Sequence, residues 1–259
     1  IKKCRAPEKA ADCLQYERMY ESGICEVEPG LFSMTMAFTD VNFQLARQEE
    51  QKSLFTQYSE FLNYFDPDTH LQISLVTRRV DEAEFRRDTF LPLRGDNRDR
   101  YSEEMNRVIS EKALQGQNGL IREKYITISL HEDDYRKAQV RLLKRAEDIQ
   151  NLFKRMGSTV RRLSGIERLN LLHGITRPEE VMGFSYDWLL AEDSLTTKDF
   201  IAPSGYNWKP EHDDSRAVYN DRYQFGEYYG KVLYLRDIAP QMKDNLLSLL
   251  SDLDFDNAI

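Results

Sequence analysis

Basic side chains are the residues of this sequence most able to bind a partner. Ten lysines and arginines lie between positions 136 and 168, against three acids, so this stretch carries a net charge of +7 within a chain of net charge −8. A basic helix face is most often simply solvated, but it can also dock an acidic protein, anionic lipid headgroups or nucleic acid. The expected contact residues are Arg136, Lys137, Arg141, Lys144, Arg145, Arg161 and Arg162.

The segment nearest to a phosphate-binding loop is Gly-Glu-Tyr-Tyr-Gly-Lys-Val at positions 226–232. Such a loop needs four residues between its glycines, and a Ser or Thr after the lysine to hold magnesium. Here one spacer residue is missing, and Val232 stands where the hydroxyl is needed. The segment therefore predicts a hairpin turn, and the sequence predicts no catalytic residue, no metal ligand and no cofactor of its own in this fragment.

Acidic clusters beside two histidines are the remaining chemical candidates. His131 precedes Glu132-Asp133-Asp134, and His212 precedes Asp213-Asp214. Carboxylates of this kind can attract a divalent ion, so a metal-dependent enzyme using Asp133/Asp134 or Asp213/Asp214 is the third hypothesis after the two given below. Acids also favour the start of a helix, which is the more common reason for such a cluster. The histidines have no H-x-x-x-H spacing, so a zinc site built on one helix is unsupported.

Composition indicates an ordinary globular chain. Of its 259 residues, 41% are hydrophobic and 31% charged, which is enough to bury a complete core. No apolar run reaches the roughly 18 residues that span a bilayer. Cys4, Cys13 and Cys25 are odd in number and fit neither a disulfide framework nor a zinc pattern, so free thiols in the cytoplasm are expected.

Alternating strand and helix patterns must position these residues. The pattern at 21–77 predicts a first unit: a short strand and tight turn after position 21, a strand Leu31–Phe38, a helix at 48–65 and a strand at 71–77. A helix ended by Gly116 and Gly119 and a strand at 125–130 follow. The clearest helix is 134–156, because apolar residues recur there every three or four positions and leave the other face cationic. A strand at 159–163 and a short helix at 165–172 come next.

Positions 219–253 repeat the opening pattern, with a strand at 219–225, a turn at Gly226 and Gly230, a strand at 232–235 and a helix at 241–253. No strand follows, which predicts a truncated second repeat and a longer parent protein. The expected fold class is α+β (mixed α/β), with mixed sheets covered by helices. The expected domains are an arm at 1–20, an α/β subdomain at 21–175, an ordered aromatic and proline-rich insertion at 176–217, and the second repeat at 218–259, packing on the first.

Four segments carry a resemblance to a known family. They are Phe-Leu-Asn-Tyr-Phe-Asp at 61–66, Asn118-Gly119-Leu120, Leu-Leu-His-Gly-Ile at 171–175 and Ser-Leu-Thr-Thr-Lys-Asp-Phe-Ile-Ala-Pro-Ser at 194–204. In this order the segments resemble the N-terminal region of conjugative-transfer ATPases of type IV secretion systems, in the form carried by mobile genetic elements of Gram-positive bacteria. The signature residues of the last segment are Thr196, Thr197, Lys198, Asp199, Phe200 and Pro203.

The resemblance implies a non-catalytic assembly module. In this family a motor domain follows, which supplies the phosphate-binding loop and uses ATP and magnesium. The implied partners are other secretion subunits and the chain's own motor domain, with self-association possible. The implied place is the cytoplasmic, inner face of the cell membrane, peripheral to it and not inserted.

Two alternatives stay open on the residues themselves. The +7 segment, together with Trp188 and Trp208, also fits a nucleic-acid-binding domain that guides the transferred DNA strand, although the basic face lacks aromatics that would stack on bases. Residues 196–204 form either a packing loop or a contact surface. Packing is favoured because Phe200 and Ile201 are apolar and Pro203 fixes the turn.

Overall fold

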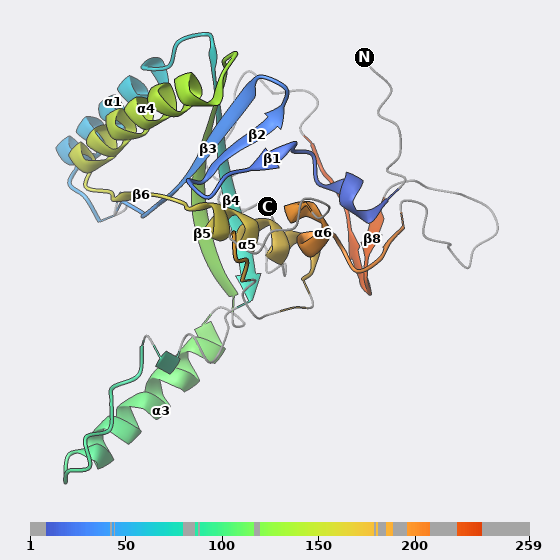
Figure 1. Cartoon of the computed structure of the whole chain (residues 1–259). Helices are drawn as coiled ribbons and strands as arrows, with labels where there is room; N and C mark the ends of the chain where they lie inside the picture. Colours follow the sequence, from blue (N-terminus) through green and yellow to red (C-terminus); the bar gives the residue numbers. More distant parts are fainter. Residues whose placement is uncertain are drawn as a thin grey trace, which may run out of the picture.

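The computed structural model describes residues 9–41, 43, 45–79, 86–87, 89–116, 120–178, 180, 185–188, 196–207 and 222–234. Helices cover a six-stranded sheet, and a small three-stranded sheet lies beside it (Figure 1). This confirms the α+β class. The expectation of mixed pairing was wrong, because every strand pair in the described residues is antiparallel.

The main sheet has the order β1-β2-β3-β5-β4. On the side of β3 away from β5, two strands share the pairing: β2 pairs with the first half of β3, and β6 pairs with the second half. The strands are β1 (Arg18–Met19), β2 (Ile24–Glu28), β3 (Leu31–Phe38), β4 (Thr69–Arg79), β5 (Leu120–His131) and β6 (Val160–Arg162).

The chain order β3-α1-β4-β5-α4-β6 makes two split β-α-β units. β5 lies between β3 and β4, and β3 lies between β5 and β6. Each helix therefore joins two parallel strands that are not neighbours, while the inserted strand runs the opposite way. This is the ferredoxin-like arrangement, and it explains why β-α-β patterns in the sequence produce a wholly antiparallel sheet.

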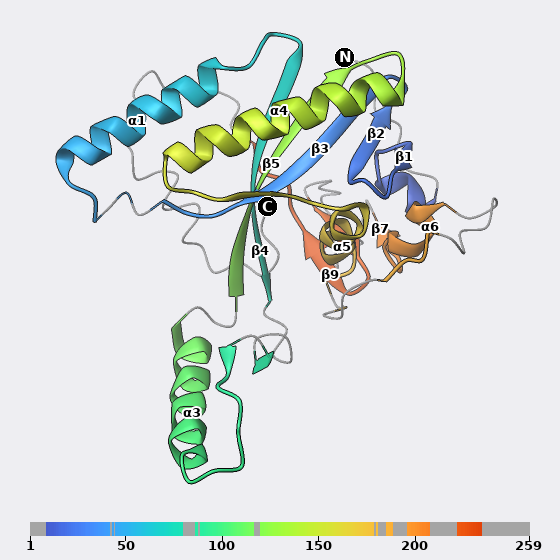
Figure 2. The same ribbon diagram turned by 60° about the vertical axis from the view of Figure 1, so that its left-hand side comes forward.

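Helices α1 (Gln48–Asn63) and α4 (Tyr135–Arg155) lie side by side on one face of this sheet (Figure 2). Their apolar sides meet the strands in the largest core cluster, which includes Met34, Met36, Ile126 and Ile128. Phe61 of α1 is fully buried, and its ring packs edge-on against Phe65 and Phe153.

Helices α5 (Gly165–Thr176) and α6 (Thr197–Ile201) cover the opposite face near β1 and β2. A 3₁₀ turn, η1 (Ala10–Cys13), packs against α6. Residues 9–20, which the sequence suggested as an arm outside the first subdomain, belong to this layer instead. Leu14, Tyr16 and Met19 are buried in the same cluster as Leu169 of α5 and Ile201 of α6.

The turn between β1 and β2 is fastened to the start of α5. The backbone N–H of Gly165 donates to the carbonyl of Glu21 at 2.9 Å. The Arg168 guanidinium donates to the carbonyl oxygens of Gly23 and Ser33, both at 2.9 Å, and to Oγ of Ser33 at 3.1 Å. Burial lowers the pKa of Arg168, whose described hydrogen-bond partners are all uncharged.

Strands β4 and β5 pair along eleven consecutive residue pairs and carry helix α3 (Asp99–Gly116) between them, well apart from the other helices (Figure 1). Across this pair the Arg78 guanidinium meets the Glu123 carboxylate in two hydrogen bonds, of 2.9 and 3.0 Å. Burial alone would raise the pKa of Glu123, but the hydrogen bonds and charge of Arg78 outweigh burial and hold this pKa below its ordinary range.

Because the folded pKa of Glu123 is lowered, its stabilising effect is present above the ordinary glutamate pKa of about 4.3 and is lost as the pH falls through the lowered value. We expect Glu123→Gln to reduce the free energy of unfolding by about 1 kcal/mol near pH 7, since both partners stay about one third exposed to solvent. Below about pH 4 this difference should shrink towards zero, as measured by urea denaturation across pH.

The control for this prediction is Glu104→Gln, which removes a similar two-bond contact with Arg107 on the exposed surface of α3. We expect almost no change in unfolding free energy from it at any pH. A Glu123→Gln effect that is equal at neutral and acid pH would contradict the assignment.

The small sheet contains β7 (Tyr206–Asn207), β8 (Tyr223–Phe225) and β9 (Tyr228–Gly230). β8 and β9 form a hairpin with Gly226 in its turn at a φ of 56°, as expected, but the second strand lies at 228–230, within the segment expected to be the turn. The expected strand at 232–235 was wrong for positions 232–234, where Val232, Leu233 and Tyr234 are 75–80% exposed and form no strand. Leu235 and the expected helix at 241–253 lie outside the described residues.

Candidate functional site: the cationic face of α4

Helix α4 has a basic outer face because its buried apolar residues lie on the inner side and, among its large apolar residues, Val140 alone is exposed. Asp134 caps the helix, accepting the backbone N–H of Arg136 at 3.0 Å, so this acid is explained by the helix start. The buried residues are Ala138, Leu142, Ala146, Ile149 and Phe153. The exposed basic residues are Arg136, Lys137, Arg141, Lys144, Lys154 and Arg155.

Three of the seven expected contact residues form ion pairs within the chain. Arg141 pairs with Glu132 in the β5–α4 connection. Arg161 pairs with Glu167 in the first turn of α5. Arg145 pairs with Asp66, just after α1. An arginine that is already paired with a carboxylate has less net charge to offer a partner. These three arginines therefore mainly join segments of the fold to one another.

Arg145 is the centre of a polar contact between α1 and α4. Its Nη1 donates to the Tyr64 hydroxyl at 2.8 Å, and its guanidinium carbon lies 5.1 Å from the Tyr64 ring centroid. The Tyr64 hydroxyl in turn donates to Asp148, and burial together with this bond raises the pKa of Tyr64. The motif at 61–66 therefore joins the two helices: Phe61 fills the core, and Tyr64 and Asp66 hold Arg145.

Strand alternation separates the other two arginines that the sequence placed together. Arg162 stands opposite Met36 in the β6–β3 ladder, on the face that α4 covers. Arg161 stands opposite Ala37, whose side chain packs towards α5. Among the described residues, no ion pair is made by Arg136, Lys137, Lys144 or Arg162, and all four are exposed. These four are the part of the predicted set that remains able to bind a partner.

The signature residues at 196–204 form α6 and the turn after it. Thr196 and Asp199 make a capping box, in which the Thr196 N–H donates to the Asp199 carboxylate at 2.8 Å. This bond and that of the Thr196 hydroxyl lower the pKa of Asp199. Thr197 meets the Tyr16 hydroxyl at 2.8 Å, and the Lys198 ammonium lies 5.2 Å from the Tyr16 ring centroid. Burial raises the pKa of Tyr16 to about 12.

The motif at 171–175 and the residues just after it contact the motif at 194–204, with Leu172 packed in the same cluster as Ile201 and Ala202. The Thr176 hydroxyl donates to the Ile201 carbonyl at 2.6 Å, and Nε of Arg177 donates to the Ala202 carbonyl at 2.7 Å. Ile201 and Ala202 are buried, whereas Phe200 is 40% exposed. Residues 201 and 202 therefore pack α6 onto α5.

The three histidines that the structure describes, His70, His131 and His173, each contact a neighbouring side chain of the fold. His173 is buried and its Nε2 lies 2.8 Å from the Glu180 carboxylate. His70 and His131 are on neighbouring strands, with ring centroids 6.4 Å apart. Within the described residues, no three His, Cys, Asp or Glu side chains gather as metal ligands. His212, Asp213 and Asp214 lie outside the described residues.

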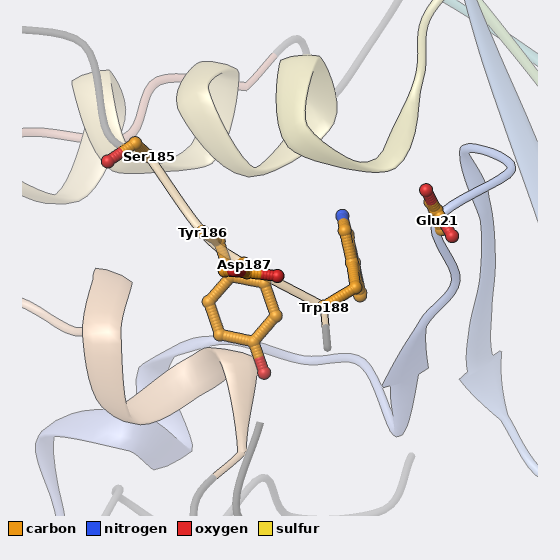
Figure 3. A pocket seen from close by; sticks show the side chains of 5 residues that line it. All are labelled: Glu21, Ser185, Tyr186, Asp187 and Trp188. Carbon is orange, nitrogen blue, oxygen red and sulfur yellow. The ribbon is translucent and has the colours of Figure 1, made fainter. Parts of the chain in front are cut away.

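A hollow of about 430 Å³ lies beside the start of α5 (Figure 3). The Tyr186 and Trp188 rings pack edge-on there, with centroids 4.9 Å apart. Trp188 also contacts the cluster beneath α5, and a Cβ on Gly165 would stand 2.7 Å from its ring. Trp188 thus packs the α5 start, while Trp208 is outside the described residues. The lining residues are Glu21, Ser185, Tyr186, Asp187 and Trp188.

Sequence reasoning missed an apolar surface at the β4 end of the sheet. Ile73 and Leu75 alternate along β4 as core residues do, yet they are 42% and 43% exposed. On α1, Phe55, Tyr58 and Leu62 are also exposed. The sequence held one sign of this surface: the apolar residues of 48–65 cover a wider part of the helix than the side that faces the core requires.

No helix within the described parts of the chain has both the length and the apolarity needed to cross a bilayer. Comparison of the sequence with family models gives no match, and comparison with curated proteins gives none either.

Proposed function

We propose that this chain is a non-catalytic assembly module of a conjugative type IV secretion ATPase, which docks the motor domain onto membrane channel components through the outer face of α4. The family resemblance of the motifs at 61–66, 118–120, 171–175 and 194–204 supports the context. The observation that carries the docking role is the row of exposed basic residues on α4, of which Arg136, Lys137 and Lys144 have no ion pair among the described residues.

The geometry of this row suits an extended acidic protein surface. From Arg136 to Arg155 the helix rises roughly 29 Å at 1.5 Å per residue. The chain as a whole carries −8, so an acidic partner would be attracted by this face and repelled by much of the remaining surface. Such a charge distribution orients the encounter and favours one docking direction.

A protein partner fits this face better than a DNA strand. Single-stranded nucleic acid is usually held by aromatic rings that stack on its bases. The exposed apolar side chain of α4 is Val140, which is aliphatic, and the aromatic residues of the helix, Tyr135 and Phe153, are partly or fully buried. The acidic Glu147 also interrupts the row and would repel a phosphate backbone.

The test reverses the free charges in the parent protein: Arg136→Glu, Lys137→Glu and Lys144→Glu together. We expect the transfer frequency between cells to fall roughly 10- to 100-fold, since lost charge pairs at an interface cost about 1.5 kcal/mol or more. ATP hydrolysis by the purified protein should stay unchanged, because the substitutions lie on an exposed face of a non-catalytic module.

The matched control reverses three exposed cations elsewhere, Lys52, Arg94 and Arg100, and should leave transfer near the wild-type frequency. Wild-type transfer by the α4 variant would overturn the docking role. Binding of the 259-residue chain to labelled single-stranded DNA at about 50 mM salt, lost in the α4 variant alone, would instead favour the strand-guiding alternative.

A further inference from the structure

We infer that the hollow beside the start of α5 binds an organic cation, held between the indole ring of Trp188 and the carboxylate of Glu21. The hollow lies on the face of the sheet that α5 covers, opposite to α4. The inference therefore stands or falls independently of the docking function proposed for the α4 face.

The hollow has the size and the lining of a small-ligand site. Its volume of about 430 Å³ falls among ligand pockets, which measure roughly 300–1,000 Å³. Of the described residues that line it, two are acids, two are aromatic and none is basic. Carboxylates and the faces of aromatic rings both carry negative potential, so this lining attracts a cation and repels an anion.

The indole ring of Trp188 offers one face to such a cation. The edge of the Tyr186 ring meets the other face, with centroids 4.9 Å apart and planes at 80° (Figure 3). Glu21 lies on the side that Tyr186 leaves open. A Cβ built on Gly165 would stand 2.7 Å from the Trp188 ring and 3.0 Å from the Cα of Glu21, so both residues flank the same point. A cation on the open face of the indole ring therefore also reaches the Glu21 carboxylate.

The Glu21 carboxylate has no cation of its own in the part of the chain that the structure describes. Its side chain is exposed, and it makes neither an ion pair nor a hydrogen bond with another described residue. The positive end of α5 does not neutralise it, because Ser164 and Glu167 already cap that helix. Asp187 adds a second carboxylate to the lining. A bound cation would supply the missing countercharge of Glu21.

The fold fixes both walls of the hollow before a ligand arrives. The carbonyl of Glu21 accepts the backbone N–H of Gly165 at 2.9 Å. Trp188 packs in the cluster beneath α5, and the Tyr186 ring also meets Phe200 of α6, with centroids 5.4 Å apart. A site formed in advance loses little conformational freedom on binding, which favours affinity.

The ligand class that fits is a guanidinium, ammonium or quaternary ammonium group on an organic stem. Such a cation rests on an aromatic face while a carboxylate meets its charge. It can come from an arginine or lysine side chain of a partner protein, or from a free small molecule. A cationic side chain of about ten non-hydrogen atoms supports a Kd of roughly 1 mM.

Tryptophan fluorescence measures this binding. The chain has two tryptophans, so Trp208→Phe leaves Trp188 as the single emitter. We expect N-acetyl-Gly-Arg-Gly-amide, titrated at constant ionic strength, to change the emission saturably with a Kd of about 1 mM. The same peptide with citrulline keeps the shape of arginine without its charge and should bind at least roughly 10-fold more weakly. Calorimetry on the unaltered chain repeats both titrations without a substitution.

Two further probes separate the sources of the cation. They are the same peptide with lysine in place of arginine, and choline. Tighter binding of the peptides identifies a side chain of a partner protein, whereas tighter binding of choline identifies a free quaternary amine. Either result supports a cation site in the hollow.

Glu21→Gln tests the carboxylate and should weaken binding of the arginine peptide roughly 5- to 10-fold. Its matched control is Glu28→Gln, at an exposed position at the end of β2, which loses the same charge away from the hollow and should bind like the unaltered chain. Circular dichroism should show both variants folded. The inference is overturned if no cation binds saturably below about 20 mM, if citrulline and arginine peptides bind equally, or if both glutamine variants lose the same affinity.

Discussion

Replacing Gly23 by alanine is expected to destabilise the fold by roughly 3–5 kcal/mol, near the upper limit for one substitution. Gly23 has a φ of 84°, which costs an alanine about 1–2 kcal/mol. An added Cβ would also press into the backbone carbonyl of Leu163, far inside contact distance. The β1–β2 turn would have to leave the start of α5, and the hydrogen bonds of Gly165 and Arg168 to this turn would be lost with it. Urea denaturation measures the change.

Gly157→Ala is the matched control. Gly157 has a similar φ of 82°, but a Cβ there meets nothing within 4 Å. Its expected cost is therefore the backbone term alone, about 1–2 kcal/mol. If both variants lost the same stability, close packing of the turn against Leu163 would play no part in the fold.

Phe61→Ala is expected to reduce the free energy of unfolding by about 3–5 kcal/mol. The side chain is fully buried, and its ring lies 5.2 Å from Phe65 and 5.0 Å from Phe153 between centroids. Removing it leaves a cavity between α1 and α4 and ends both edge-to-face contacts. The measurement is the urea midpoint, with an unchanged slope showing that the unfolding reaction is still the same.

Phe43→Ala is the control for this cavity, because Phe43 precedes α1 and its side chain is 49% exposed. We expect a change below about 1 kcal/mol, in proportion to the smaller apolar area removed. An equally large loss at Phe43, or a loss below about 1 kcal/mol at Phe61, would show that the α1–α4 contact adds little to stability.

Local patterns in the sequence predicted the elements well. The strand Leu31–Phe38 has the predicted bounds, and α4 begins and ends within one residue of the prediction. The Gly226 turn is a hairpin, as predicted from its failure to match a phosphate-binding loop. Each of these depends on residues a few positions apart, where side-chain spacing and the freedom of glycine decide the backbone.

The tertiary structure decided how those elements combine. The sequence suggested mixed pairing. In the structure an oppositely directed strand lies between the two parallel strands of each unit, so every described pair is antiparallel. The sequence grouped Arg161 with Arg162, whereas the β6–β3 register turned them to opposite faces, and Arg141 and Arg145 found carboxylates supplied by other segments. The motifs at 171–175 and 194–204 meet only once α6 packs on α5, where Leu172 joins the cluster of Ile201 and Ala202.

The exposed apolar surface of α1 and β4 was also hidden from the sequence. A periodic pattern of apolar residues shows which residues share a side of an element. The segments Leu31–Phe38 and 134–156 reveal this from their own spacing. Whether that side is covered depends on which element lies against it, and here α4 covers the centre of the sheet while β4 stays at the edge. Spacing along the chain is a local property, whereas burial, ion pairing and strand neighbours depend on contacts between residues far apart in the sequence.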